Sequence, residues 1–330
     1  MGDKKRRRLR IGLLLLLVLV AGINTVAFMQ TWAMTHYAAA GTRTLRPEQL
    51  SLLDKIGVVL TGVTVPRPTN KNTPADRGLA YVSERIPVGD SEGGELDAWY
   101  IAQEGAPGIV LLFPGYAESI EGLLPQAIEY HAMGWSTLLV DFRGEGDSTG
   151  SSTTLGAREA RDVATSLDYA RREWPGGQYV LYGVSMGAAS ILRAYAEEGA
   201  RPDALVLESP FDSLLSTVQN RFDAIGLPSF PAAQLMVFWG SVQLGYNGFA
   251  DNPISFAVSV QCPVLFMYGT ADPRVTARQS EAIYARLNPS GGKTSVAFQG
   301  LGHESLLAGD RSLWSTSVAQ FLRMVSGGNR

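Results

Sequence analysis

Cysteine and histidine are both scarce in this sequence. Among its 330 residues there are one cysteine, Cys262, and three histidines. A single cysteine excludes an intramolecular disulfide, so the sequence contains no evidence for or against an oxidising compartment. One cysteine and three scattered histidines offer no ligand cluster for a transition metal, and we expect no metal and no cofactor. Cys262 directly precedes an apolar run, and we expect it to be buried and inert.

The chain also lacks a large excess of charge of either sign. Its 28 basic and 31 acidic residues give a net charge of −3, which provides no reason to expect nucleic acid as a partner. Without an N-terminal leader, roughly 250–280 residues remain, which one large α/β domain can bury in a single core. No internal repeat is present, and nothing in the sequence indicates an obligate protein partner.

One segment near the N-terminus lacks charge altogether. Residues 11–29 contain no charged side chain, and the basic residues Lys4, Lys5, Arg6, Arg7, Arg8 and Arg10 precede them. A helix of this length spans roughly 28 Å, close to the hydrocarbon thickness of a bilayer. We therefore expect a basic cytoplasmic tail at residues 1–10 and a transmembrane anchor at residues 11–29. The positive-inside rule then places the rest of the chain on the outer side, periplasmic or extracellular.

A cleaved signal peptide is the alternative for the same segment. A basic start followed by an apolar run is typical of signal peptides, and Ala38-Ala39-Ala40 supplies small residues downstream. The uncharged stretch is long for a cleaved segment, which favours the uncleaved anchor. With cleavage, the protein would be secreted.

Residues 30–78 are expected to form an amphipathic helix and a linker. Apolar residues recur at helical spacing in residues 47–60, and we expect this face to pack on the body of the protein, with lipid as the alternative. Residues 65–78 contain three prolines and are typical of a connector.

Short apolar runs and amphipathic stretches alternate through residues 79–330. We expect strands near 80–87, 96–102, 108–113, 135–141, 178–183, 204–208, 263–268 and 294–298, and helices near 119–133, 157–173, 186–198, 276–287 and 313–325. Such alternation predicts an α/β domain with a mostly parallel sheet and helices on both faces.

Residues 211–260 form a long insertion between two of these strands, and many of them are aromatic or aliphatic. Loops of this length usually have a function or a structure of their own. We expect a small helical cap that lines an apolar acyl pocket. The alternative is that the same aromatic residues only pack the cap onto the body.

The motif Gly183-Val184-Ser185-Met186-Gly187 is the most informative stretch of the chain. Small residues two positions before and after a serine permit the sharp turn from strand to helix that exposes the serine hydroxyl above a sheet. A plain turn is the alternative, since only three positions of the pattern are fixed. A strand-like run precedes the motif and a helix-forming run follows it, which favours Ser185 as a nucleophile.

A serine nucleophile requires a base within hydrogen-bonding distance. His36 lies just after the apolar N-terminal segment, and His131 lies at the end of an expected helix. His303 remains, in a glycine-rich loop before the last expected helix. We therefore assign His303 as the base.

The base in turn requires a carboxylate that orients it. Asp272 follows an apolar strand and lies between Ser185 and His303, in the chain order nucleophile, acid, base. Helix capping or an Asx turn before Pro273 is the alternative role for Asp272. Asp212, which follows the preceding strand, is its rival as the acid.

Negative charge on the carbonyl oxygen of the substrate requires preorganised N–H donors. One donor is the amide of Met186, next to the nucleophile. We assign the second to the amide of Tyr116, in the loop after the strand at residues 108–113. An ordinary Pro-Gly turn is the alternative for this loop.

These motifs resemble those of the α/β-hydrolase superfamily over about residues 79–326. The points of likeness are Phe113-Pro114-Gly115-Tyr116, Asp141-Phe142-Arg143-Gly144-Glu145-Gly146-Asp147-Ser148, residues 183–187, Gly269-Thr270-Ala271-Asp272 and Gly302-His303. The chain is similar to the group that includes acylglycerol lipases, carboxylesterases and relatives of serine aminopeptidases. The resemblance implies Ser185, Asp272 and His303 as a catalytic triad. Many members have His-Gly where this chain has Pro114-Gly115, but a backbone donor should survive that change.

The expected activity is hydrolysis of a carboxylic ester, either a small molecule or a lipid, through an acyl-enzyme. A peptidase that binds a free amine through Glu118 or Glu121 is the alternative, although these carboxylates also suit a helix N-terminus. A non-catalytic, membrane-tethered binding module is a third hypothesis. The three triad residue types in the required order argue against it.

Overall fold

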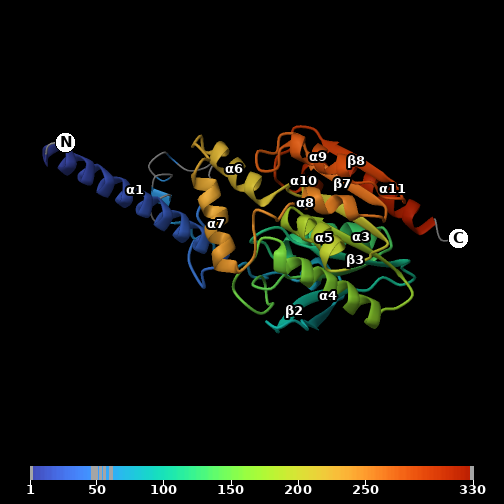
Figure 1. Ribbon diagram of the computed structural model, residues 1–330. Coiled ribbons are helices and arrows are strands. Elements are labelled where there is room, and N and C mark those ends of the chain that lie inside the picture. Colours follow the sequence, from blue (N-terminus) through green and yellow to red (C-terminus); the bar gives the residue numbers. More distant parts are fainter. Residues whose placement is uncertain (1–2, 46–50, 52–53, 55–56, 59–61, 328–330) are drawn as a thin grey trace.

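The computed structural model describes residues 3–45, 51, 54, 57–58 and 62–327, and it has one long helix that projects from an α/β body (Figure 1). The amphipathic helix expected at residues 47–60 falls mostly outside the described residues. The following connector is mostly irregular, with one short 3-10 helix, η2 (Pro74–Arg77).

Eight strands form a single sheet in the order β1-β2-β4-β3-β5-β6-β7-β8. Strand β2 pairs antiparallel with both β1 and β4, and all the other pairs are parallel, so the expected mostly parallel sheet is confirmed. The strands are β1 (Val82–Pro87), β2 (Glu95–Ile101), β3 (Gly108–Phe113), β4 (Ser136–Val140), β5 (Gln178–Val184), β6 (Ala204–Glu208), β7 (Val264–Gly269) and β8 (Lys293–Phe298).

Helices cover both faces of this sheet. The body helices are η3 (Ile120–Leu123), α3 (Leu124–Ala132), α4 (Ala157–Glu173), α5 (Met186–Glu197), α9 (Ala277–Arg286), α10 (Leu306–Gly309) and α11 (Arg311–Gly327). Within β3, Ile109, Leu111 and Phe113 join a core with α4, α5 and α9, whereas Val110 and Leu112 join a core with α3 and α11. Successive side chains of a strand point to opposite faces, so one buried strand serves both layers.

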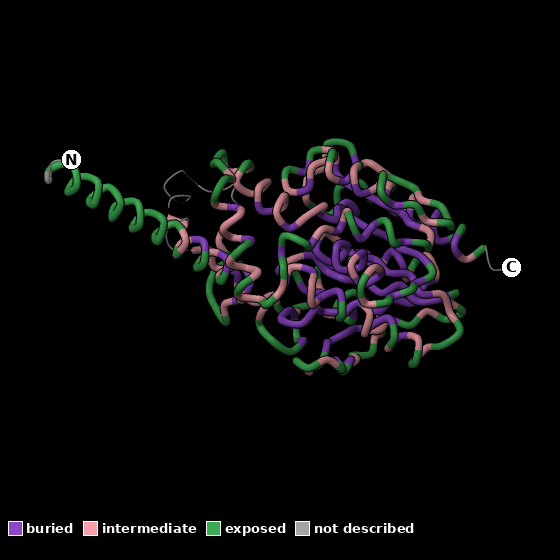
Figure 2. Tube along the Cα trace, in the orientation of Figure 1, coloured by how far each residue is buried: buried purple, intermediate pink, exposed green. Residues whose placement is uncertain are grey.

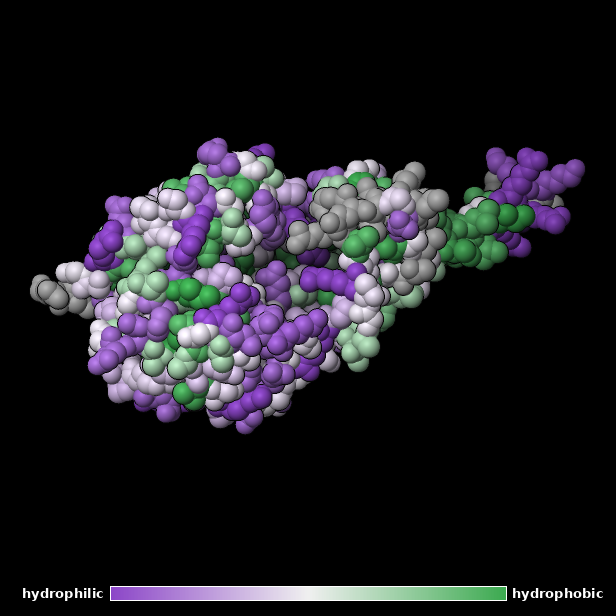
Figure 3. All heavy atoms as spheres, turned by 180° about the vertical axis from the view of Figure 1, so that it is seen from behind, coloured by the Kyte–Doolittle hydropathy of each residue, from purple (hydrophilic) through white to green (hydrophobic). Residues whose placement is uncertain are grey.

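The N-terminal helix α1 (Asp3–Thr35) contains the uncharged segment. By length and composition it can cross a membrane, and its apolar side chains are exposed over most of its length (Figure 2). In Figure 3 a hydrophobic band separates a hydrophilic N-terminal end from the body. The basic residues expected as a separate tail are the first turns of the same helix.

The insertion between β6 and β7 is helical. It contains α6 (Leu214–Ala224), α7 (Ala232–Leu244), α8 (Pro253–Phe256) and the 3-10 helix η4 (Ala257–Ser259). Helix α7 packs against the last third of α1, where Phe28 and Trp239 meet edge to face with 5.4 Å between ring centroids. The N-terminal helix and the cap therefore form one unit.

Candidate active site

Ser185 lies in a sharp turn between β5 and α5. Its φ of 51° lies in the left-handed region, which is strained for a residue with a side chain. The Ser185 amide donates a hydrogen bond to the Glu208 carbonyl at the end of β6, at 2.8 Å, which helps to hold this conformation.

The two glycines of the motif are needed because backbone lies against them. A Cβ on Gly187 would lie 2.5 Å from the Phe113 carbonyl oxygen, and a Cβ on Gly183 would lie 2.6 Å from the Ala188 amide nitrogen. Real Cβ atoms do not approach backbone so closely. The motif is therefore a close-packed elbow, as the sequence predicts.

The structure brings the three expected triad residues together. His303 Nε2 lies 3.0 Å from Ser185 Oγ, and His303 Nδ1 lies 2.6 Å from Asp272 Oδ2. Both distances are within hydrogen-bonding range, and the Asp272 side chain is buried. Three residues from separate loops therefore form one hydrogen-bonded line.

Asp272 also forms an Asx turn, one of the alternative roles that the sequence allows for it. Its Oδ1 accepts the backbone amides of Arg274 and Val275, at 2.8 and 2.9 Å, which is an Asx turn. One oxygen thus fixes the loop while the other faces His303. The cap of α9 is Thr276 instead.

The rival carboxylate, Asp212, is used elsewhere. Its Oδ1 accepts hydrogen bonds from the Ser213 amide, the Ser216 hydroxyl and the Gln279 side chain. These bonds join the start of α6 to α9, so Asp212 has a structural role at the base of the cap.

The other two histidines lie outside this line. His36 stacks on Trp32 at the end of α1, with 3.5 Å between ring centroids. His131 lies in the last turn of α3. Only His303 of the three histidines bonds to Ser185 in the described part of the chain.

The loop expected to supply an oxyanion donor lies against the elbow. The Gly187 position directly contacts the Phe113 and Pro114 carbonyls, which lead into Gly115 and Tyr116. Among the described residues, the Tyr116 amide has no hydrogen-bond acceptor. Met186 is the first residue of α5, so its amide lacks an intrahelical partner. Neither assigned amide has a hydrogen-bond acceptor among the described residues, as the expected role of an oxyanion donor requires.

Two buried carboxyl groups of the segment 141–148, to which the sequence pattern gives no role, hold this loop. Glu145 Oε1 accepts the Ala117 amide at 3.0 Å, and Asp141 Oδ1 accepts the Ile120 amide at 2.9 Å. Ala117 has a φ of 54°, so the loop is strained where Glu145 holds it. Burial raises the pKa of Asp141 to about 7 and raises that of Glu145 well above its ordinary value.

The end of α1 reaches the same loop. The Tyr37 hydroxyl donates to Glu145 Oε1 at 2.6 Å, and the Tyr116 hydroxyl donates to the Met34 carbonyl at 2.6 Å. The Tyr37 amide also bonds the Ser151 carbonyl at 2.8 Å. No local sequence pattern signals these contacts, because the partners are far apart along the chain.

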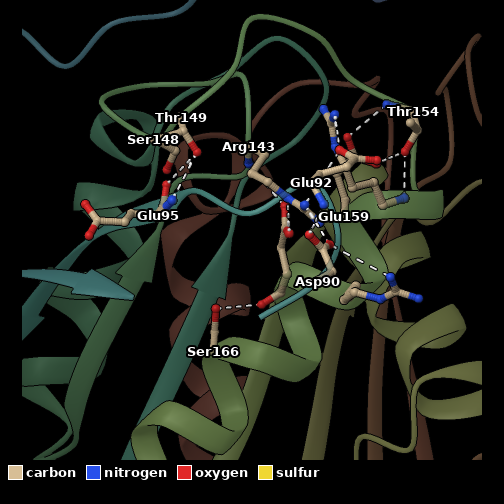
Figure 4. Close-up of polar contacts among 12 residues, drawn as sticks. Asp90, Glu92, Glu95, Arg143, Ser148, Thr149, Thr154, Glu159 and Ser166 are labelled. Carbon is tan, nitrogen blue, oxygen red and sulfur yellow. Dashed lines mark hydrogen bonds and ion pairs between the residues drawn. The ribbon is translucent and has the colours of Figure 1, made fainter. Parts of the chain in front are cut away.

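Asp141 and Glu145 lie in the segment that follows β4. An ion-pair network around Arg143 supports this segment (Figure 4). Arg143 pairs with Asp162 on α4 and with Asp90, in both cases at 2.7 Å. Glu159 accepts hydrogen bonds from Thr154 and from neighbouring amides. These buried charges fix the loop on which the end of α1 rests.

The carboxylates considered for amine binding differ in their surroundings. Glu121 accepts the Lys71 amide at 2.6 Å and also bonds the Asn72 side chain, so it holds the connector. Glu118 is exposed. The carboxylate of Glu121 is therefore already engaged by the protein.

The aromatic residues of the insertion divide between two environments. Trp239 packs on Phe28 and donates to Asn24 Oδ1 at 3.2 Å, so it joins the cap to α1. Phe230, Phe238 and Phe249 are exposed. The expected acyl pocket remains a prediction; an apolar cavity of about 40 Å³ lies between α1, α6 and α7.

The chain is similar in sequence to a family of serine hydrolases and to several known proteins. Residues 105–235 match the family model described as serine aminopeptidase, S33. An uncharacterized protein of Mycobacterium tuberculosis is 27% identical over 267 residues, covering 77% of this chain and 84% of that protein. The lysophosphatidylserine lipase ABHD12 of Macaca fascicularis is 22% identical over 258 residues, covering 71% of this chain and 63% of that protein.

Several solved protein structures are similar to this fold. A structure of the esterase Pf2001 of Pyrococcus furiosus superposes with a TM-score of 0.65 at 23% identity, covering 78% of this chain and 96% of that one. Together with the family match and the curated relatives, it shows that the chain has the α/β-hydrolase fold.

Proposed function

We propose that the protein is a membrane-anchored serine hydrolase that cleaves carboxylic esters, with an apolar or lipid ester as substrate. The observation that carries this proposal is the line from Asp272 through His303 to Ser185, with 2.6 and 3.0 Å between the bonded atoms. A base at this distance from a hydroxyl can take its proton as the oxygen attacks.

In the first half of the reaction, Ser185 Oγ attacks the ester carbonyl carbon and its proton passes to His303 Nε2. Asp272 keeps the other imidazole proton on Nδ1 and stabilises the imidazolium. The carbonyl oxygen becomes negative and accepts hydrogen bonds from the Tyr116 and Met186 amides. The acyl–oxygen bond then breaks, and His303 returns the proton to the departing alcohol.

In the second half, water attacks the acyl-enzyme. His303 takes a proton from the water as its oxygen bonds to the acyl carbon. The bond to Ser185 then breaks, the proton returns to Ser185 Oγ, and the carboxylic acid leaves. The net reaction consumes one water and needs no other reactant.

The names of two similar proteins and the apolar α1 favour an ester over a peptide. The description of the matching family model makes an aminopeptidase the second candidate. Such an enzyme needs a carboxylate that can bind the substrate amine; Glu121 is occupied by the connector, whereas Glu118 is exposed. The names of ABHD12, a lipase, and Pf2001, an esterase, favour an ester, and the apolar α1 favours a substrate found in membranes.

The test uses the full chain in detergent and a fluorophosphonate, which labels activated serines. Wild type should be labelled and should hydrolyse short-chain and long-chain esters, whereas Ser185→Ala should not be labelled. We expect the ester kcat to fall by about 10³-fold or more for Ser185→Ala and His303→Ala. Asp212→Asn is the matched control, because this carboxylate holds the cap, and it should remain labelled.

Two results would contradict the proposal. The first is an unlabelled wild type, or labelling of Ser185→Ala equal to that of wild type. The second is turnover of aminoacyl amides without turnover of esters, which would favour the aminopeptidase.

A further inference from the structure

Helix α7 of the cap is predominantly apolar, carries no charge and is not fully buried. Residues 224–250 contain no charged side chain. In α7 only Ala233 and Val237 are buried. A helix that is apolar on all sides normally lies inside a large core or in a membrane. Phe238 and Val242 are exposed and most other residues of α7 are only partly buried, so the second environment fits it better (Figure 2).

The contacts between α7 and α1 occur at the level of the expected membrane segment. Trp239 donates to Asn24, and the Gln243 side chain donates to the Phe28 carbonyl at 2.9 Å. Both Asn24 and Phe28 lie within residues 11–29. Wherever this part of α1 meets lipid, α7 lies beside it at the same depth (Figure 1).

The packing between the two helices is typical of helices in a bilayer. The Thr31 hydroxyl donates to the Met236 carbonyl at 3.1 Å, and a Cβ on Gly240 would lie 3.2 Å from Thr31 Cγ2. Small residues that permit close approach and polar side chains that bond across the interface characterise helix pairs in membranes.

The side of α7 that faces away from α1 and from the body carries exposed apolar residues. Phe238 and Val242 are one turn apart and are 47% and 57% exposed. With Phe249 they line an open hollow of about 390 Å³. The loop before α7 adds Phe230, which is 75% exposed.

We propose that α7 lies in the outer leaflet beside α1, and that lipid hydrocarbon covers Phe238, Val242 and Phe249. A helix of 13 residues is about 20 Å long, too short to cross a bilayer, so α7 lies at the interface. The inference rests on the proposed membrane anchoring of α1. It adds that the cap of the enzyme is itself immersed, so that an ester substrate is met within the leaflet.

The test places a polarity-sensitive fluorophore at single cysteines in the full chain. Cys262→Ser removes the native thiol, and the protein is reconstituted into phosphatidylcholine vesicles with or without phosphatidylcholine spin-labelled on its acyl chain. Val242→Cys tests the cap. Leu16→Cys on α1, at 53% exposure, is the positive control. Asp168→Cys, exposed on α4, is the negative control.

We expect blue-shifted emission that the spin-labelled lipid strongly quenches at positions 16 and 242, and polar, unquenched emission at position 168. Thermal unfolding in detergent confirms that each variant is folded. Quenching at position 16 but not at 242 would overturn the immersion of the cap and leave the anchor intact. Absence of quenching at both would overturn the anchor as well.

A second copy of the chain is the other possible cover for this surface. In that case, the probe at position 242 would be blue-shifted but unquenched, and two Val242→Cys chains would cross-link. That result would overturn the proposal. Fluorophosphonate labelling of Ser185 is measured on the same samples, so a failure of the proposed chemistry is seen separately from a failure of membrane contact.

Discussion

Buried carboxyl groups flank the candidate site, and burial is the main influence on their pKa. It raises the pKa of Glu208, next to the elbow, to about 7, although a hydrogen bond from Trp314 acts in the opposite direction. Such a group is protonated in the folded chain at a pH where it is ionised in the unfolded chain. The free energy of unfolding therefore falls as pH rises from the ordinary value of 4.5 to about 7.

Glu208→Gln should remove this part of the pH dependence. Relative to the variant, wild type should lose about 3 kcal/mol of stability between the two pKa values. Denaturant unfolding in detergent at a series of pH values measures the difference. The exposed Glu104→Gln is the control, and its curve should run parallel to that of wild type. Parallel curves for Glu208→Gln would contradict the expected pKa.

We expect Tyr37 to act as a positioning residue for the loop proposed to supply an oxyanion donor. Tyr37→Phe removes the hydrogen bond to Glu145, which in turn holds the Ala117 amide. We expect a loss of about 1–2 kcal/mol in stability. The ester kcat should fall several-fold while KM changes little. The proposed oxyanion donors stabilise the negative oxygen of the transition state, so a shift of the loop weakens that stabilisation more than it weakens substrate binding.

The matched control for Tyr37 is Tyr169→Phe. Tyr169 makes the same kind of bond, to Glu84 at 2.6 Å, but between α4 and β1. This variant should lose stability and keep its kcat. Equal kcat values for the two variants would show that Tyr37 has only a structural role.

At the scale of elements, the elbow depends on the contact between the start of α5 and the end of β3. Gly187→Ala would place a methyl group 2.5 Å from a β3 carbonyl, and backbone cannot move away without displacing the sheet. We expect a destabilised protein that the fluorophosphonate no longer labels.

Gly122→Ala is the control for this prediction. Gly122 lies in η3, and a Cβ there meets no atom within 4 Å. Labelling and thermal stability should therefore be close to those of wild type. A Gly187→Ala variant that behaves like Gly122→Ala would show that the elbow is less closely packed than described.

At the scale of the whole molecule, the end of α1 and the residues directly after it pack into the body of the protein. Residues 34–38 bond to the Tyr116 loop, to Ser151 and to Val65. Removal of the chain up to Ala40, as signal cleavage would do, would also remove Tyr37 and the α1–α7 contacts. This arrangement favours the anchor over the signal peptide.

We therefore expect the protein to retain its N-terminal segment. Intact mass measurement of protein extracted from membranes should give the full chain, and alkaline carbonate should not release it. A chain in which a cleavable signal peptide replaces residues 1–29 should be released. A native protein that begins near residue 40 would contradict this expectation.

Most elements of the body could be predicted because their signals are local. The helix expected at residues 157–173 has those bounds, and the strand at 204–208 does too. The strand expected at 80–87 begins two residues later, at Val82, and the expected 119–133 helix begins as a 3-10 turn, η3, before α3. Element ends depend on hydrogen bonds that periodicity does not reveal.

The sequence by itself determined the alternation of strands and helices, the apolar N-terminal helix and the choice of Ser185, His303 and Asp272 as candidates. These depend on side-chain periodicity, charge and residue order, which are properties of the sequence alone and do not require knowledge of distant contacts. Tertiary structure decided between Asp272 and Asp212, because only folding sets which carboxylate lies 2.6 Å from the imidazole.

Tertiary structure also decided which parts of the protein the N-terminal helix contacts. The bond from Tyr37 to Glu145 joins residues 108 positions apart, and α7 meets α1 across more than 200 positions. An apolar helix looks the same in sequence whether protein or lipid covers it. Its surroundings depend on which surfaces the fold has already brought together, and for α7 those surfaces cover only one side.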